Sequence, residues 1–226
     1  HIDDVNGEIA LCILSAINVG AINELSELES VCDLAVRALD EIIDYQDYPV
    51  KAAEVSTKAR RSLGIGYIGL AHYLAKMDLK YSDPKAWEAV DRLSEAFQYY
   101  LLRASCNLAE EKGKCSAFDR TKYADGLLPI DHYKKEVDEI VPHKTRMAWE
   151  SLRKDIAKHG LRHSTLSAQM PSESSSVVSN ETNGIEPPRA ILSIKKSKKG
   201  PLKQIVPGYP KLKNSYTLLW DMKNNE

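Results

Sequence analysis

A serine-rich run, "MPSESSSVV" at residues 170–178, concentrates hydrogen-bond donors in a short segment. It stands between the alternating stretch "LRHSTLSAQM", which predicts a buried strand, and apolar residues that favour a helix. With Pro171 as the first helical residue, free N–H groups and serine hydroxyls at such a turn can bind phosphate oxygens. A solvated serine turn that caps a helix explains the pattern equally well. Glu173 argues against a plain phosphate site, because its charge has to point away or serve another purpose.

Cys12 is the second candidate, since a thiolate is a nucleophile and a reductant. It lies in a continuous apolar run, Ile9–Leu14, that is typical of a strand buried on both faces. A thiol in such a strand is most often only a small apolar side chain. The cysteines are Cys12, Cys32, Cys106 and Cys115. Their wide spacing and the lack of a CxxC pair predict reduced thiols rather than a zinc site.

Other patterns have simpler explanations than a function. "GIGYIG" at residues 64–69 fits a dinucleotide-binding motif, but the polar, helical-looking "AAEVSTKARRSL" before it indicates close helix packing or a turn. Tyr99 and Tyr100 could suggest radical transfer, although aromatic residues within a helix usually belong to the core. The lysine-rich "KKSKKGP" predicts a solvated hairpin tip. Four histidines show no metal-ligand spacing, so no metal is assigned: His72, His143, His159 and His163.

Helical spacing and capping residues organise the rest of the chain. They predict helices over residues 26–48, ended by Pro49, and over about 59–77. Two further helices are predicted over about 84–111, ended by Gly113, and within 143–164, ended by Gly160. Mixed loop and short helix are expected between about 116 and 145. "AILSIKKSKKGPLKQIVPGYP" predicts two strands or extended arms. The pattern as a whole predicts an α/β unit whose strands are joined by long helical excursions.

The composition fits one substantial domain or two small ones. The 226 residues are 43% hydrophobic, and 31 Lys and Arg against 32 Asp and Glu give a formal charge of −1. This balance advertises neither nucleic acid nor an anionic membrane as a partner. No stretch is long and apolar enough to span a membrane, and "HIDDVNGEIA" lacks the features of a signal peptide. The expected location is therefore cytoplasmic.

Several stretches together resemble the large, catalytic subunit of class Ia ribonucleotide reductase, of the bacterial and bacteriophage type. They include "NGEIALCILSAINVGAI", "RRSLGIGYIGLAHYLAK", "HGLRHSTLSAQMPSESSSVVSNETNGIEPPRA" and "LLWDM". The resemblance extends from about Gly7 to Met222. It implies a ten-stranded α/β barrel of which residues 1–226 form a single partial domain, most of the second half-barrel. It also implies radical reduction of ribonucleoside diphosphates to deoxyribonucleotides.

The resemblance assigns roles to particular residues. Cys12 in "GEIALC" matches a cysteine of the redox pair that supplies two electrons to the ribose and ends as a disulfide. Ser172, Glu173, Ser174 and Ser175 match the loop and helix start that bind the substrate diphosphate. This match favours the phosphate interpretation of the serine-rich run. "NGIEPPR", residues 183–189, is a family signature to which we assign structural support only.

Other parts of the family's machinery have no counterpart in this sequence. They are the radical-bearing cysteine, the partner of Cys12, the effector domain, the first half-barrel, the radical-relay tyrosines and the cysteine-bearing tail. We therefore expect a partner polypeptide carrying the N-terminal half, a small subunit with a diiron-tyrosyl radical, and thioredoxin or glutaredoxin as reductant, with no cofactor bound directly. The chain could be a split-gene product, which we favour, or a piece of a longer chain. A non-catalytic remnant that binds subunits is the alternative function.

Overall fold

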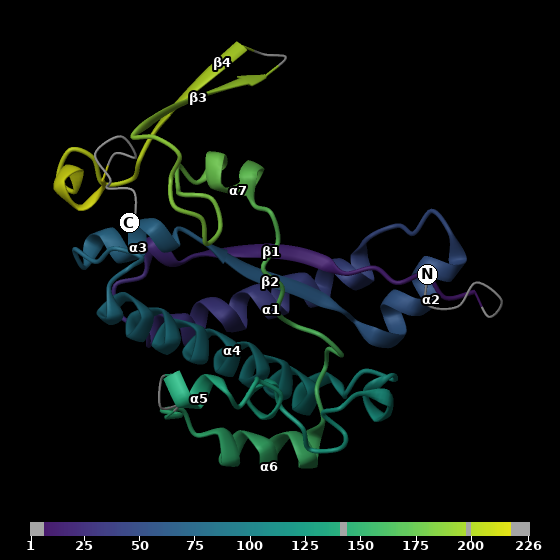
Figure 1. The fold of residues 1–226 in the computed structure, drawn as a ribbon. Coiled ribbons are helices and arrows are strands. Elements are labelled where there is room, and N and C mark those ends of the chain that lie inside the picture. Colours follow the sequence, from purple (N-terminus) through teal and green to yellow (C-terminus); the bar gives the residue numbers. More distant parts are fainter. Residues whose placement is uncertain (1–6, 141–143, 198–199, 218–226) are drawn as a thin grey trace. The chain divides into compact units, whose positions relative to one another are not determined.

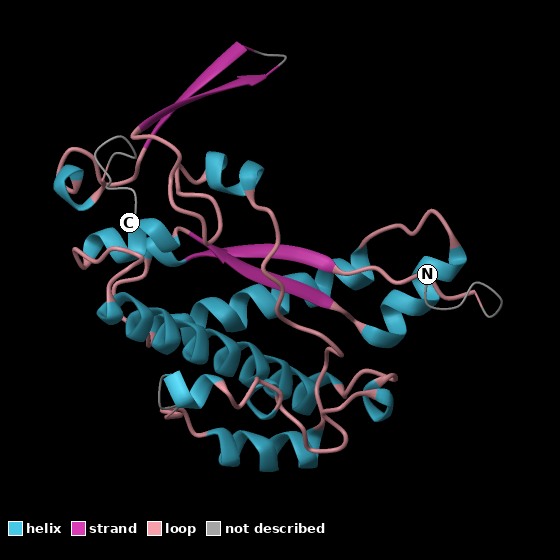
Figure 2. Cartoon of the chain, in the orientation of Figure 1, coloured by secondary structure: helices cyan, strands magenta, loops and turns pink. Residues whose placement is uncertain are grey.

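The computed structural model describes residues 7–140, 144–197 and 200–217 (Figure 1). Contacts between residues cluster in two compact units. Unit 1 contains the stretch that ends at Ser15, Leu28–Ile65 and Ser94–Ala168, and unit 2 contains Ala16–Glu27, Gly66–Leu93 and the stretch that begins at Gln169. Mixed helix and strand confirm the α/β class (Figure 2).

The helices and strands of the described chain have the following bounds. The helices are α1 (Glu27–Tyr45), α2 (Lys51–Arg60), α3 (Leu70–Lys76), α4 (Pro84–Lys112), α5 (Val137–Ile140), α6 (Trp149–His159) and α7 (Glu173–Val178). The strands are β1 (Ile13–Asn18), β2 (Leu63–Ile68), β3 (Leu192–Ser197) and β4 (Gly200–Ile205). β1 pairs with β2, and β3 pairs with β4.

Amphipathic helices build the core of unit 1. On α1, Leu28, Cys32, Val36, Leu39 and Ile43 are buried at the spacing of one helical face. The aromatic side chains of α4 and α6 meet edge to face, with the rings of Tyr99 and Trp149 5.3 Å apart. The predicted helices over residues 26–48 and 84–111 are confirmed, and Tyr99 is a core residue, only 7% exposed.

The predicted helix over about residues 59–77 is confirmed only at its ends, and its middle is a strand. The helix α2 ends at Arg60, because Arg61 adopts a left-handed conformation with φ 48°. The strand β2 follows, and α3 begins only after Gly69. The glycines of "LGIGYI" disfavour a helix, and its isoleucine and tyrosine residues favour a strand, which explains why the segment is extended. The glycine motif therefore lies within a strand and at the turn that follows it.

Residues 161–170 are predicted to form a strand, and they do so only in part. Thr165 O and Leu166 O accept hydrogen bonds from two N–H groups of β2, at 2.9 and 2.8 Å. Only a single parallel bridge, Ile65 to Ser167, is regular enough to count as β-structure. The ladder cannot extend far beyond this point, because Pro171 has no N–H to donate.

The hairpin of β3 and β4 is the regular part of unit 2. The two strands run antiparallel from the pair Leu192 and Ile205 to the pair Ser197 and Gly200, which confirms the two predicted strands. The side chains of Leu192, Ile194 and Leu202 are exposed. Lys198 and Lys199 of the predicted lysine-rich tip lie outside the described residues.

Candidate functional site

Cys12 lies immediately before β1 and is exposed, so its prediction as part of a buried strand is wrong. Its neighbours Leu11 and Leu14 are 45% and 54% exposed. A strand is buried on both faces only when other elements cover each face of its sheet. The described chain leaves the Cys12 segment uncovered, which its apolar composition alone could not reveal. The thiol of Cys12 is therefore open to solvent in the described chain.

Gly64 of the strand β2 lies close to this thiol. A Cβ atom built on Gly64 would lie 3.8 Å from Cys12 Sγ and 2.6 Å from Leu14 Cδ2. The second distance is shorter than Cβ atoms tolerate, so any larger residue would displace Leu14. Gly64 thus allows the backbone of β2 to approach the segment that carries Cys12.

The other three cysteines are in a different environment. Cys32, Cys106 and Cys115 are all buried. Burial raises the pKa of Cys32 to about 12 and that of Cys106 to about 11, because the thiolate loses its hydration. Burial also raises the pKa of Cys115. Cys12 is the single exposed thiol of the four, and accessibility is what thiol chemistry requires.

The serine-rich run forms a short helix start, shifted from its predicted position. Pro171 is not the first helical residue: Ser172 is the N-cap residue and α7 begins at Glu173. The hydroxyl of Ser172 donates to Met170 O at 3.0 Å and is buried. This local bond holds the Met-Pro-Ser turn and explains the shift, because a serine that bonds backwards favours a cap over the first helical turn.

Ser174 and Ser175 differ from the serines that follow them. Both are exposed on the first turn of α7, which carries no side-chain hydrogen bond at its N-cap. Ser176 is instead buried and donates to Glu173 O at 3.0 Å. The N–H groups of the first turn of a helix have no partner within the helix. Together with the two exposed hydroxyls they can bind an acceptor such as a phosphate oxygen.

A buried carboxylate supports the C-terminal end of α7. Glu181 is 4% exposed, its N–H donates to Ser176 O at 2.7 Å, and its Oε2 lies 2.9 Å from His72 Nδ1. A Cβ on Gly20 would lie 2.5 Å from Glu181 Oε2. The contact thus requires glycine at position 20, which is the only sequence signal that could have indicated it.

The "NGIEPPR" segment of unit 2 makes backbone contacts that suit its predicted supporting role. Gly184 O accepts a hydrogen bond from the N–H group of Leu70 at 3.3 Å, and Thr182 O, just before the segment, accepts one from Gly69 at 3.0 Å. These two bonds attach this part of the chain to the start of α3. Ile185 O also accepts a hydrogen bond from the hydroxyl of Tyr81, at 2.8 Å, in the loop after α3.

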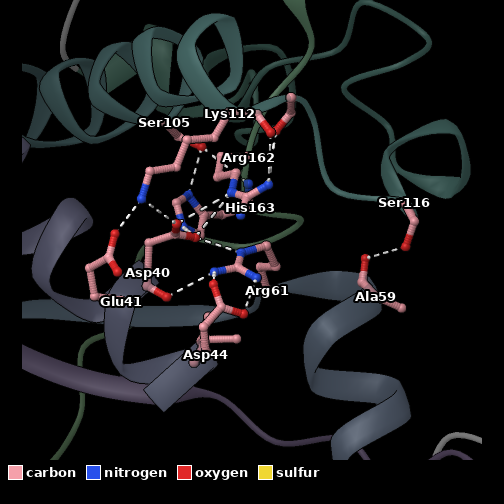
Figure 3. Close-up of polar contacts among 12 residues, drawn as sticks. Asp40, Glu41, Asp44, Ala59, Arg61, Ser105, Lys112, Ser116, Arg162 and His163 are labelled. Carbon is pink, nitrogen blue, oxygen red and sulfur yellow. Dashed lines mark hydrogen bonds and ion pairs between the residues drawn. The ribbon is translucent and has the colours of Figure 1, made fainter.

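Unit 1 also contains a buried ionic cluster, shown in Figure 3. Arg61 Nε donates to Asp40 Oδ1 at 2.5 Å, and the same oxygen lies 3.1 Å from His163 Nε2. Arg162 Nε donates to Asp40 at 3.2 Å, and Ser105 Oγ lies 2.9 Å from His163 Nδ1. The cluster ties α1 to α4, to Arg61 between α2 and β2, and to residues 162–163.

The environment of the cluster sets its ionisation. Burial disfavours the charged form of Asp40, but hydrogen bonds from His163 and Arg61 outweigh it and hold the pKa of this carboxyl well below its usual range. Burial lowers the pKa of His163, an effect that Asp40 only partly offsets. The cluster is thus a carboxylate held by guanidinium groups next to a neutral imidazole. Sequence reasoning missed it, because its members are far apart in the chain.

The part of the chain that the structure describes has neither a metal-binding cluster nor a membrane-spanning helix. No group of three or more His, Cys, Asp or Glu side chains in this part of the chain could hold a metal ion. Within the same residues, no helix has the length and apolar character needed to cross a membrane.

Comparison with known proteins identifies the class. A model of the family "Ribonucleotide reductase, barrel domain" matches residues 2–225. The chain is 58% identical over 225 residues to "Ribonucleoside-diphosphate reductase subunit alpha" of Buchnera aphidicola subsp. Schizaphis graminum and 59% identical over 226 residues to that of Haemophilus influenzae. Both alignments cover 100% of this chain and 30% of the relative.

A more distant relative agrees with the first two. The protein of the same name from Enterobacteria phage T4 is 43% identical over 231 residues, covering 97% of this chain and 29% of the relative. The chain belongs to the ribonucleotide reductase barrel-domain family. It spans about 30% of the length of the curated relatives it matches.

Proposed function

We propose that this chain is a component of the large subunit of a ribonucleoside-diphosphate reductase and contributes to radical reduction of ribonucleoside diphosphates. Its α/β fold would then form the second half of a ten-stranded barrel. The observation that carries the proposal is the exposed thiol of Cys12, in a chain whose three other cysteines are buried. Membership of the reductase family supplies the context for that thiol.

In this proposal Cys12 is a reductant. Its thiol and a second thiol, supplied by polypeptide outside this sequence, together give up two electrons and two protons and join as a disulfide. The ribose accepts the electrons and loses its hydroxyl as water. The solvent-open position of Cys12 suits this role, because a redox thiol has to meet both the substrate and, later, the reductant that opens the disulfide.

The substrate diphosphate would bind at the start of α7. Ser174 and Ser175 offer hydroxyls and N–H groups, and Ser172 positions the turn through its bond to Met170 O. Glu173 is exposed at the first position of the helix, so its carboxylate can accept a hydrogen bond from a substrate hydroxyl rather than contact the phosphates. Cys12 belongs to unit 1 and α7 to unit 2. The redox role of Cys12 and the diphosphate site at α7 are therefore each argued from contacts within one unit.

The remaining machinery would come from partners. We propose that the polypeptide carrying the N-terminal half provides the radical cysteine and that a small subunit with a diiron-tyrosyl radical generates the radical. Thioredoxin or glutaredoxin would reduce the disulfide. These reductants keep thiols reduced in the cytoplasm, which we propose as the place of action.

A Cys12→Ser substitution tests the proposal in the reconstituted reductase. Deoxyribonucleotide formation should fall by about 10³-fold or more, because a serine hydroxyl cannot form the disulfide. Binding of the diphosphate substrate should stay unchanged. Cys32→Ala, which alters a buried thiol, should retain turnover. An active Cys12→Ser enzyme would contradict the redox assignment. Loss of turnover and of substrate binding in Cys12→Ser and Cys32→Ala alike would favour the non-catalytic alternative.

A further inference from the structure

Unit 1 contains a cavity of about 530 Å³ that the proposed function does not use. Its wall is formed by the end of α2, by residues 121–132 and by residues 164–165. The charged or titratable side chains that line it are Arg60, Lys122, Tyr123 and His132, and no Asp or Glu of the described chain does so. The cavity therefore offers cationic groups without an acidic competitor in its lining.

Arg60 has one donor left without a partner. Its Nη2 donates to Glu8 Oε2 at 2.6 Å, whereas Nε is buried and has no hydrogen-bond partner in the described chain. The Arg60 side chain as a whole is 21% exposed and lines the cavity, so a ligand oxygen can accept from the guanidinium N–H groups that are not bound to Glu8. Glu8 already balances the charge of Arg60, which leaves Lys122 and His132 to balance the charge of a bound anion.

The walls of the cavity are held in place by bonds of their own. Ser164 N donates to Arg60 O at 2.9 Å, and Ser62 Oγ lies 3.1 Å from Ser164 Oγ. In a pair of hydroxyls only one proton lies between the oxygens, so the other remains to be donated elsewhere. The two serines, which line the same cavity as Arg60 and Lys122, can thus donate one hydrogen bond to a ligand there.

The one carboxylate next to His132 in the chain is occupied elsewhere. Asp131 Oδ2 accepts from Leu128 N at 2.7 Å and from Arg153 Nη1 at 2.9 Å. Asp131 is thus the anionic partner of Arg153, and its bond to Leu128 N fixes the loop that forms one wall of the cavity. Leu127, Pro129 and Tyr123 also line the cavity, so its lining combines apolar surface with cationic groups.

We propose that this cavity binds a small phosphorylated molecule with a planar ring, such as an aromatic phosphate. The phosphate lies against Arg60, Lys122 and His132, and the ring packs against Tyr123 and Leu127. The site uses none of the residues assigned to the reductase reaction, so it stands or falls independently of that function.

Pyridoxal 5′-phosphate is a suitable probe, because it combines a phosphate, a planar ring and an aldehyde. Its aldehyde condenses with a lysine amine, with loss of water, and borohydride then reduces the C=N bond to a stable amine. The full polypeptide that carries this sequence is labelled, and peptide mass spectrometry quantifies the modification at each lysine. Lys134, exposed in the same segment, is the internal reference.

Lys122 should be modified about tenfold more than Lys134, the preference expected from one charge-assisted hydrogen bond to the phosphate. Pyridoxal, which lacks the phosphate, should show no such preference. Phenyl phosphate should protect Lys122 and leave Lys134 unaffected. Equal labelling of the two lysines, a preference that pyridoxal shares, or a failure of phenyl phosphate to protect would each overturn the proposal.

Two matched variants locate the phosphate. Arg60→Gln should lower the labelling of Lys122 to the level of Lys134. Arg120→Gln, which alters the other arginine near Glu8 at 4.0 Å but does not line the cavity, should leave the preference intact. Unchanged labelling in Arg60→Gln contradicts the proposed contact. If that variant does not fold, protection by phenyl phosphate in the unsubstituted protein still decides the question.

Discussion

Two regions of unit 1 contain groups that could carry chemistry, and their environments are opposite. Asp40, Arg61 and His163 are buried and bond to one another. Cys12 is exposed beside a glycine. The first region has the strongly shifted pKa values that often mark an active site, yet its polar atoms are occupied by partners within the chain. The comparison teaches that shifted ionisation indicates function only where a reacting molecule can reach the group.

The largest effect on stability is expected from breaking the buried cluster. Asp40→Asn should lower the free energy of unfolding by about 3 kcal/mol, because Arg162 would lose its anionic partner and Arg61 would keep only Asp44, which is half exposed. Denaturant titration measures the loss. Asp33→Asn is the matched control: its ion pair with Arg37 is on the same helix but partly exposed, and such pairs contribute about 0–1 kcal/mol. Equal losses in the two variants would contradict the structural role of the cluster.

The second effect concerns the space beside Cys12. Gly64→Ala should change the free energy of unfolding by at most about 1 kcal/mol, because the new Cβ meets only Leu14 Cδ2, the tip of a side chain that is 54% exposed and can move aside. The same change should slow alkylation of Cys12 by iodoacetamide, because the new Cβ would also lie 3.8 Å from Cys12 Sγ. The double variant Gly64→Ala with Leu14→Ala should recover any stability lost through the contact with Leu14. An unchanged alkylation rate in the single variant would show that β2 does not approach Cys12 this closely.

The third effect tests the serines of α7. Ser174→Ala and Ser175→Ala should each weaken binding of the diphosphate substrate by about 1 kcal/mol, the net contribution of one hydrogen bond. Isothermal titration of the reconstituted enzyme measures it. Ser179→Ala serves as control, because its hydroxyl donates to Ser175 O within the helix. Unchanged affinity in the double variant would remove the diphosphate site from these residues.

The fourth effect is a pH dependence from His163. Its pKa is lowered in the folded protein by burial, so the unfolded chain binds a proton more readily below its ordinary pKa of about 6.5. The free energy of unfolding should therefore fall as the pH is lowered from 7 to 5, with a slope of at most about 1.4 kcal/mol per pH unit.

His163→Gln should flatten this slope, whereas replacement of the exposed His132 by Gln should not. Chemical denaturation across the pH range measures both slopes. A slope that survives in His163→Gln would assign it to other groups.

Sequence reasoning succeeded where local rules decide the outcome and failed where neighbours decide it. The helix α1 followed from one apolar face, and the hairpin of β3 and β4 from two short strands around a lysine-rich turn. The strand β2 was missed because polar residues before it suggested that a helix continued past Arg61. The exposure of Cys12 could not be foreseen, because an apolar run does not reveal whether a second layer covers it.

The same limit applied to the candidate site. The serine-rich run was found from its composition, but the bond from Ser172 to Met170 O, which shifts the helix start, depends on the turn geometry. Glu181 and His163 were missed because their partners lie 109 and 123 residues away in sequence. Tertiary contacts of this kind leave no local signal.

The most direct test of the account follows the thiol of Cys12 through one turnover. The reduced, reconstituted enzyme would convert a diphosphate substrate without external reductant, and would then be denatured and alkylated for mass spectrometry. We predict that Cys12 resists alkylation until a reductant is added, while Cys32, Cys106 and Cys115 are alkylated fully. A Cys12 that remains a free thiol after product has formed would contradict its role as a reductant.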